Sequence, residues 1–132
     1  MDKLKNFRQT LCTLKEFSAT PIQTNRDKAG VIQAFEFTFE QAWKAIQKIA
    51  ADQGVPLGSP KSSFVFAMQN QWIIHTEESQ WLQMLMDRNL TAHTYEEDIA
   101  NEVLGRIISQ YIPLFSELLL MLEKASKPQK LP

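Results

Sequence analysis

Apolar side chains recur every three or four positions along most of this chain, which is the pattern of helices that bury one face. Leu4, Phe7, Leu11 and Leu14 follow this spacing, so we expect a first amphipathic helix over residues 3–18. The helix should end before Pro21, because a residue that precedes proline is pushed away from helical backbone angles.

The strongest helical pattern follows in the next segment. We expect a long helix from Asp27 to Gln53, which Gly54 terminates. Its predicted buried face comprises Ile32, Phe35, Phe39, Ala42 or Trp43, Ile46 and Ile49. After a short connector, Ser59-Pro60 has the form of an N-cap with proline at the first helical position, which predicts a short helix over residues 61–70.

Two further helices are expected in the second half of the chain. Thr76, followed by two glutamates, indicates the start of a helix that continues through Trp81, Leu82, Leu85 and Met86. Thr94 and Glu97 have the spacing of a capping box, so the last helix should begin there with Tyr95 in its first turn. Its apolar stripe is Ile99, Val103, Ile107, Tyr111, Leu114, Leu118 and Leu122. Pro113 lies inside this stripe and should kink or break the helix.

The pattern therefore predicts an all-α protein, because no strand-like alternation interrupts the helical spacing. The simplest arrangement is an antiparallel up-and-down four-helix bundle with a short additional helix. We expect one domain over residues 1–125 and a frayed C-terminal tail over residues 126–132. A composition of 44% hydrophobic and 22% charged residues is that of an ordinary globular protein and excludes a disordered one.

Composition also narrows the classes of function. Cys12 is the only cysteine, so neither an internal disulfide nor a cysteine-rich zinc site can form, and we expect a buried helical thiol. A net charge of −1 and a pI near 6.1 argue against a broad basic surface, so any RNA contact must be local or supplied by an oligomer. No uninterrupted apolar run approaches the roughly 18 residues of a membrane helix, and the N-terminus lacks an apolar signal core. We therefore expect a cytoplasmic protein with no membrane contact.

The segment Arg88-Asn89-Leu90-Thr91-Ala92-His93-Thr94-Tyr95 carries the most chemistry. Arginine can hold a phosphate, histidine can transfer a proton near neutral pH, and a tyrosine phenol can accept a transferred group. On an unbroken helix, Arg88 and His93 would point about 140° apart, because each residue advances by about 100°. If one helix instead ends near Asn89 and the next begins at Thr94, the turn can direct both side chains to one opening. The segment indicates chemistry on phosphates.

These features resemble one known family. Residues 32–44, IQAFEFTFEQAWK, together with Ser59-Pro60 and the stretch from Trp81 to Tyr95, are similar to the HEPN-type nucleotidyltransferase substrate-binding proteins, and the resemblance covers most of the chain. In that family a small helical protein is encoded beside a minimal nucleotidyltransferase. An early interpretation made it the substrate-binding half of a split transferase. A later one makes many members ribonuclease toxins that the transferase restrains as antitoxin.

The resemblance implies roles for four residues. The HEPN ribonuclease motif is an arginine, a polar residue, three residues of any type and a histidine, which Arg88, Asn89 and His93 match. Tyr95 matches the tyrosine that receives AMP from the partner transferase in the extended form of the motif. RNA cleavage of this kind needs no metal or other cofactor. Because one chain offers one suitable histidine, we expect a homodimer that brings two copies of the motif together.

Several alternatives stay open at this level. Arg88 can instead form an ion pair with Glu36 or Asp87, with His93 as an ordinary turn residue. Glu36 and Glu40 share a helix face and can hold Arg88 in place, whereas a metal site would need further inward-facing ligands. Tyr95 can be a core tyrosine with its hydroxyl at the rim. The whole protein can also be a non-catalytic substrate-binding or adaptor subunit of a split nucleotidyltransferase.

Overall fold

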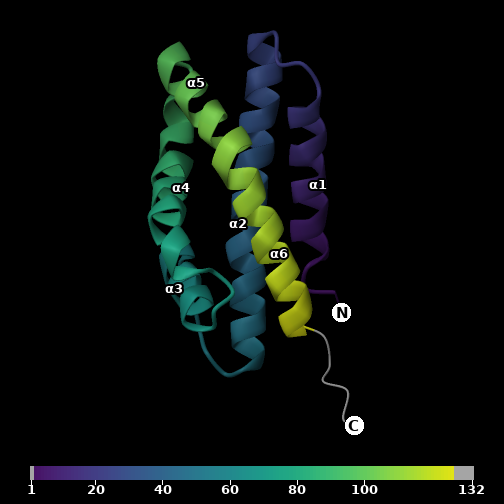
Figure 1. Cartoon of the computed structure of the whole chain (residues 1–132), viewed down its shortest axis with the longest axis vertical. Helices are drawn as coiled ribbons and strands as arrows, with labels where there is room; N and C mark the ends of the chain where they lie inside the picture. The colour runs from purple at the N-terminus through teal and green to yellow at the C-terminus, as the bar shows by residue number, and fades with distance from the viewer. Residues whose placement is uncertain (1, 127–132) are drawn as a thin grey trace.

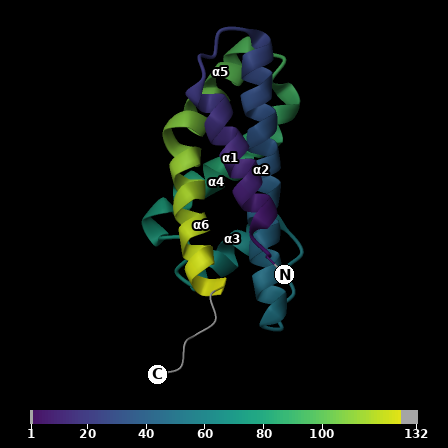
Figure 2. The same cartoon turned by 90° about the vertical axis from the view of Figure 1, so that its right-hand side faces the viewer.

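The computed structural model describes residues 2–126, which fold into helices joined by short turns. The α-helices are α1 (Lys5–Ala19), α2 (Asn25–Asp52), α3 (Pro60–Gln69), α4 (Glu78–Leu90), α5 (Glu97–Arg106) and α6 (Ile112–Ser126). No β-strand occurs between residues 2 and 126, and the predicted all-α class is confirmed. The long helices lie along the long axis of the molecule, with the short α3 near one end (Figure 1). α1 packs against both α2 and α6 (Figure 2).

The helix termini follow the local sequence in the first half of the chain. Thr24 caps α2: its hydroxyl accepts the Asp27 N–H, and the Asp27 carboxylate accepts the Thr24 N–H. The backbone N–H groups of Gln23 and Thr24 hold the pKa of Asp27 below its usual value. Ser59 caps α3 as predicted, in a reciprocal pair with Ser62. Gly54 follows α2 with a φ of 79°, a conformation that glycine adopts without steric cost.

Two predicted features near the surface are wrong. Thr76 does not cap α4; it lies in a 3-10 turn, η1 (His75–Glu77), and α4 begins after Glu77 without a side-chain cap. Cys12 is exposed on α1 rather than buried, and its thiol lies 3.8 Å from the Glu16 carboxylate one turn away. The apolar stripe of α1 passes through Phe7, Leu11 and Leu14 and leaves position 12 on the solvent side. Of the tail predicted over residues 126–132, only Ser126 belongs to the described residues, and it is the last residue of α6. Residues 127–132 lie outside the described residues.

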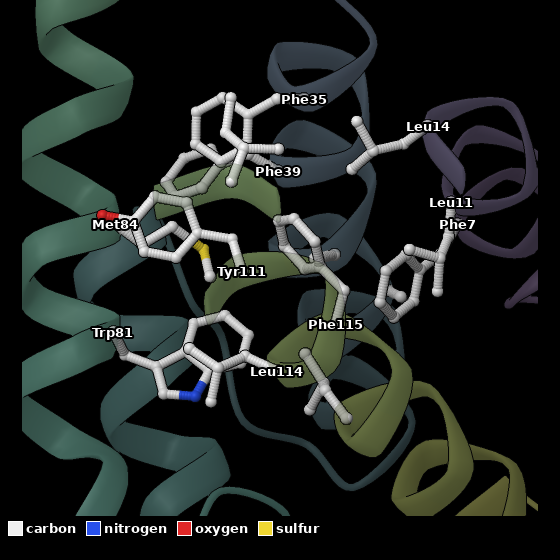
Figure 3. Close-up of a cluster of buried hydrophobic side chains, with 14 of the residues drawn as sticks. Phe7, Leu11, Leu14, Phe35, Phe39, Trp81, Met84, Tyr111, Leu114 and Phe115 are labelled. Carbon is white, nitrogen blue, oxygen red and sulfur yellow. The ribbon is translucent and has the colours of Figure 1, made fainter. Parts of the chain in front are cut away.

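The core is aromatic and joins the helices in one cluster (Figure 3). Phe115 of α6 lies 6.2 Å from Phe7 of α1 and 5.9 Å from Trp81 of α4, measured between ring centroids. Trp81 in turn lies 4.9 Å from Phe64 of α3. Rings at these separations bury large areas in a fixed geometry, so this chain of contacts fixes the positions of four helices against one another.

The last part of the described chain is one continuous helix from Glu97 to Ser126 that contains a wide π-helical turn, η3 (Ile107–Tyr111), between α5 and α6. In η3 the N–H of Ile112 donates to the carbonyl of Ile107, five residues earlier. Pro113 follows directly and has no N–H to donate to the preceding turn. Of the kink or break predicted at Pro113, the break does not occur, because the helix continues to Ser126. The helix instead accommodates the proline next to a widened turn, which is a common cause of irregular helix geometry.

This helix also has the length and composition of a membrane-spanning segment. The sequence did not lead us to expect a membrane-like segment here, because charged and polar residues interrupt the apolar runs between Glu97 and Ser126. The core helix of a globular protein has the same length and composition. Here 33% of its apolar segment is buried inside the bundle, including Ile107, Tyr111 and Phe115.

Two acidic side chains approach each other where η1 meets α6, and they make a testable contribution to stability. Burial and the neighbouring Glu117 raise the pKa of Glu77 above its usual value. A raised pKa means that the folded state binds this proton more tightly than the unfolded state, whose pKa is about 4.3. The free energy of unfolding should thus increase as the pH falls through the folded pKa, and the ionised pair should destabilise the protein at neutral pH.

We expect Glu77→Gln to be more stable than the wild type at pH 7, because the substitution removes the repulsion from Glu117. The advantage should disappear below about pH 4, where the wild-type carboxyl is protonated. Urea unfolding at both pH values measures the difference. Glu102→Gln, at an exposed position of α5, is the control. An equal effect of the two substitutions at pH 7 would contradict this account.

Candidate functional site at the α4–α5 corner

The segment from Arg88 to Tyr95 forms the corner between α4 and α5. α4 ends at Leu90, a 3-10 turn, η2 (Thr91–His93), follows, and α5 begins at Glu97. Two hydroxyl groups hold the turn: Thr91 donates to the Arg88 carbonyl at 2.7 Å, and Thr94 donates to the Thr91 carbonyl at 2.9 Å. The predicted change of direction between Arg88 and His93 is confirmed. Among residues 2–126, however, no hydrogen bond or ion pair joins these two side chains.

The predicted capping box at Thr94 is wrong. Its hydroxyl is already engaged with Thr91, and the N-cap of α5 is Glu96, which makes no side-chain capping bond. Tyr95 therefore precedes α5 instead of lying in its first turn. The alternative that Tyr95 is a core residue is also wrong, because 81% of it is exposed.

Arg88 is held at the end of α4 by contacts to two elements. Its guanidinium lies 3.4 Å from the Glu36 carboxylate of α2 and donates to the Thr91 hydroxyl at 3.1 Å. The expected support from Glu36 is thus present. Glu40 does not contribute, since it pairs with Lys44 one turn along α2 at 3.5 Å.

The pair between Arg88 and Glu36 is weak enough to be exchanged. The two side chains remain 35% and 32% exposed, and ion pairs of this kind contribute about 0–1 kcal/mol. A phosphate that accepts charge-assisted hydrogen bonds from the same guanidinium gains about 1.5–3 kcal/mol for each. Arg88 can therefore release Glu36 in favour of a phosphate ligand.

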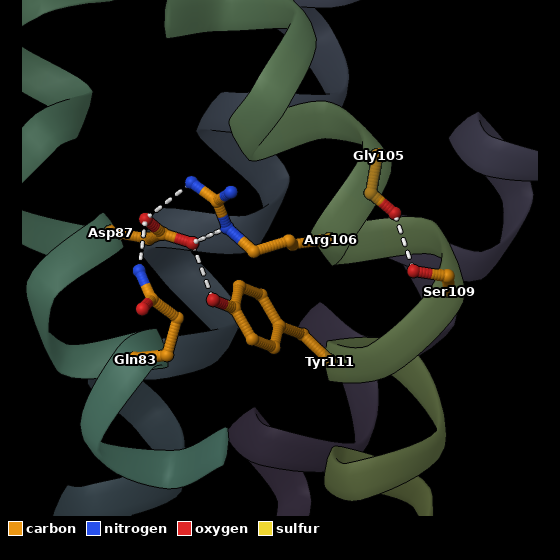
Figure 4. Close-up of polar contacts among 6 residues, drawn as sticks. All are labelled: Gln83, Asp87, Gly105, Arg106, Ser109 and Tyr111. Atoms are coloured by element: carbon orange, nitrogen blue, oxygen red, sulfur yellow. Dashed lines mark hydrogen bonds and ion pairs between the residues drawn. The ribbon is translucent and has the colours of Figure 1, made fainter. Parts of the chain in front are cut away.

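Asp87, the neighbour of Arg88 in the chain, faces the interior of the bundle and is completely buried. Arg106 binds both of its carboxylate oxygens, with Nε 2.6 Å from Oδ2 and Nη2 2.9 Å from Oδ1 (Figure 4). The Tyr111 hydroxyl donates to Oδ2, and the Gln83 amide donates to Oδ1 at 3.2 Å. Asp87 consequently supports the site by fixing the last turn of α4, and it is not a partner of Arg88.

The wide turn η3 makes this arrangement possible. Arg106 and Tyr111 are five residues apart, which would place them about 140° apart on a regular α-helix. A turn closed by i to i+5 hydrogen bonds returns them to one side, so both side chains reach Asp87. The carboxylate raises the pKa of Arg106, while burial and the same carboxylate raise the pKa of Tyr111 well above its usual value. Arg106 therefore stays charged and Tyr111 stays a hydrogen-bond donor.

Arg106, Tyr111 and Gln83 were not predicted as partners of Asp87. Tyr111 was placed correctly on the buried stripe, but its hydroxyl was not assigned a contact. A usable signal was present in α4, whose buried residues are Trp81, Met84 and Asp87 at a spacing of three. A carboxylate at the third position of a buried stripe requires a cationic or hydrogen-bonding partner from another element.

The side chains with reactive groups lie on the outer side of the corner. Asn89, His93 and Tyr95 are all exposed. The rings of His93 and Tyr95 are neighbours, with their centroids 6.2 Å apart. The structure thus presents a proton-transfer group and a phenol side by side on a corner that the Asp87 network fixes from inside. Between residues 2 and 126, no three His, Cys, Asp or Glu side chains gather as a metal site would require.

A groove of about 430 Å³ lies next to Tyr95. One wall is the stretch of α2 from Asn25 to Ile32, and the other runs from Thr94 to Ala100 at the start of α5. Tyr95 therefore belongs both to the corner that carries His93 and to this groove.

Two comparisons relate the chain to known proteins. A protein from Thermus thermophilus with a solved crystal structure is 32% identical and superposes with a TM-score of 0.81, over 88% of this chain and 98% of that one. No curated protein matches. The family model described as nucleotidyltransferase substrate binding protein like matches residues 2–124. Because this match spans nearly the whole chain, the protein belongs to the family of nucleotidyltransferase substrate-binding-like proteins.

Proposed function

We propose that this protein is the cytoplasmic partner subunit of a minimal nucleotidyltransferase in a two-gene, toxin–antitoxin-like system. Its working surface is the corner from Arg88 to Tyr95, which cleaves RNA without a metal and is silenced by transfer of AMP to Tyr95. One observation carries the proposal: His93 and Tyr95 are exposed side by side on a corner that the buried Asp87 network fixes from below. A rigid support with exposed reactive groups is the arrangement that catalysis requires.

The proposed cleavage uses the 2′-hydroxyl of the RNA as its nucleophile. A base removes the hydroxyl proton while the oxygen attacks the adjacent phosphorus, and an acid protonates the departing 5′-oxygen. The products are a 2′,3′-cyclic phosphate and a 5′-hydroxyl, so no water or metal is consumed. Arg88 stabilises the charged phosphorane after leaving Glu36, and Asn89 positions the phosphate or His93.

Base and acid must come from two copies of the chain. His93 is the only histidine of the corner, because the other histidine, His75, lies in η1, which precedes α4 in the chain. A two-fold dimer with the corner near its axis supplies two imidazoles and two guanidinium groups to one phosphate. Purified, EDTA-treated dimer should therefore cut single-stranded RNA, and gel electrophoresis of labelled RNA should reveal fragments ending in a cyclic phosphate. Intact RNA under these conditions would exclude metal-independent cleavage.

Tyr95 is the proposed point of regulation. Its phenolic oxygen attacks the α-phosphorus of ATP bound to the partner transferase, the bond to pyrophosphate breaks, and the phenolic proton passes to solvent. The attached nucleotide places a negative charge beside Arg88 and His93 and obstructs RNA. Because 81% of Tyr95 is exposed, the phenol is accessible to the transferase without unfolding.

We expect incubation with the cognate transferase and ATP to add AMP to Tyr95 and to abolish RNA cleavage. Mass spectrometry of the digested protein locates the modification. Tyr111, the other tyrosine, is an internal control, because it is fully buried and should stay unmodified. Tyr95→Phe should receive no AMP and should retain RNA cleavage in the presence of the transferase. An unmodified Tyr95 after complete incubation would contradict the proposed regulation.

The second candidate function is a non-catalytic substrate-binding or adaptor subunit. The ion pair of Arg88 with Glu36 favours it, because that pair gives the arginine a purely structural partner. This alternative predicts a stable complex with the transferase, no RNA cleavage by the dimer, and indifference to His93→Ala. Pull-down of the transferase combined with the RNA assay separates the two functions.

A further inference from the structure

The groove beside Tyr95 has the size of a small-molecule site. Its volume of about 430 Å³ lies near the lower end of the range of about 300–1,000 Å³ that is typical of ligand pockets. Such a space accepts one nucleotide but not a folded peptide or an RNA duplex. The groove opens beside the phenol of Tyr95, so its occupant and any group on that phenol share one space.

One wall of the groove carries a positively charged side chain that forms no ion pair among residues 2–126. Lys28 of α2 lines the groove and is half-buried. Lys28 makes no ion pair or side-chain hydrogen bond among residues 2–126, as is also true of exposed lysines such as Lys15 and Lys48, and it differs from these two in lining this groove. A lysine in the wall of an open groove attracts an anionic group of the occupant.

The remaining lining distinguishes a nucleotide from a bare anion. Ala29, Ile32 and Ala100 give the groove an apolar floor against which a flat base can pack. Glu97 on the α5 side adds a carboxylate, which accepts hydrogen bonds from hydroxyl groups and repels a second phosphate. One cation, one acceptor and an apolar floor match the phosphate, ribose and base of a nucleoside monophosphate.

We propose that this groove is a binding site for a nucleoside monophosphate. The phosphate lies between Lys28 and the Tyr95 hydroxyl, the ribose faces Glu97, and the base packs on Ala29 and Ala100. The inference rests on the proposed partnership with a nucleotidyltransferase and deepens it: the groove holds the nucleotide that is attached to Tyr95 and turns it toward α2. The same site binds free AMP more weakly, without any covalent step.

Titration of AMP into the isolated, unmodified protein tests the groove without the transferase. In an NMR titration, the amide signals of Lys28, Ala29 and Ala100 should shift with AMP, and the shifts should be smaller with adenosine or inorganic phosphate at equal concentration. Lys28→Met keeps the apolar stem and removes the charge, so AMP affinity should fall about tenfold, the effect of one charge-assisted hydrogen bond. Lys48→Met is the matched control at an exposed position of the same helix.

A second variant tests the floor without changing any charge. Ala29→Phe places a ring in the groove from an exposed position of α2 and should abolish the AMP-dependent shifts while the protein stays folded. Shifts that cluster elsewhere, or equal AMP affinity of Lys28→Met and Lys48→Met, would overturn the site. Inorganic phosphate that binds as tightly as AMP would overturn its assignment to a nucleotide. AMP binding here without modification of Tyr95 by the transferase would leave the groove in place and refute the proposed regulation instead.

Discussion

Asp87→Ala is expected to lower the free energy of unfolding by about 3–5 kcal/mol, the usual cost of removing one partner from a buried ion pair. The substitution leaves the Arg106 guanidinium and the Tyr111 hydroxyl next to each other without their common acceptor. It also detaches the last turn of α4 from η3, the contact that fixes the corner. Urea unfolding followed by far-UV circular dichroism measures the loss.

Two further variants identify the source of this effect. Tyr111→Phe removes one hydrogen bond but retains the bidentate pair of Asp87 with Arg106, so its cost should be smaller, about 1–3 kcal/mol. Asp98→Ala removes an exposed acid from the first turn of α5 and should change stability by less than about 1 kcal/mol. A cost of Asp87→Ala no greater than that of Asp98→Ala would show that the network does not stabilise the fold.

His93→Ala is expected to reduce metal-independent RNA cleavage by about 10²–10⁴-fold, the contribution of a positioned acid or base. It should also relieve the growth defect caused by expression without the transferase. Because His93 is exposed, its loss should leave the unfolding curve unchanged, which separates a catalytic effect from a structural one. Cleavage of labelled RNA in EDTA, together with growth curves, measures both effects.

The chain offers a matched control in its other histidine. His75 is also exposed in a 3-10 turn, so His75→Ala makes the same chemical change away from the corner and should retain full cleavage. Mixed dimers test whether the site is shared between copies. A mixed dimer of one wild-type and one His93→Ala protomer holds one imidazole in place of two, so it should cleave RNA about as slowly as the His93→Ala dimer. Equal activity of His93→Ala and the wild type would exclude a role of this histidine in catalysis.

The sequence was sufficient for features that depend on neighbours along the chain. The spacing of apolar residues located the helices, and the dipeptide Ser59-Pro60 located the start of α3. The turn after Arg88 was also foreseen, since one continuous helix could not direct Arg88 and His93 to one side. Each of these features follows from local backbone preference or from helical periodicity.

Features set by contacts between distant residues could not be foreseen in the same way. Asp87 and Arg106 are nineteen positions apart, and their pairing depends on the π-helical turn, which has no simple sequence signature. Thr94 and Glu97 have the spacing of a capping box, but the neighbouring Thr91 carbonyl competes successfully for the threonine hydroxyl. The direction of Asp87 toward the core, rather than toward Arg88, likewise depends on which elements surround α4.

The π-helical turn also acts as a rotational joint between the two halves of the C-terminal helix. Without its one extra residue, everything on the α5 side would rotate by about 100° about the helix axis relative to α6. Phe115 and Leu118 would still face the core, but Ala100 and Glu97 would turn away from α2, and the wall of the groove beside Tyr95 would be lost. The position of the exposed phenol thus depends on the number of residues in a turn that lies more than ten positions further along the chain and does not line the groove.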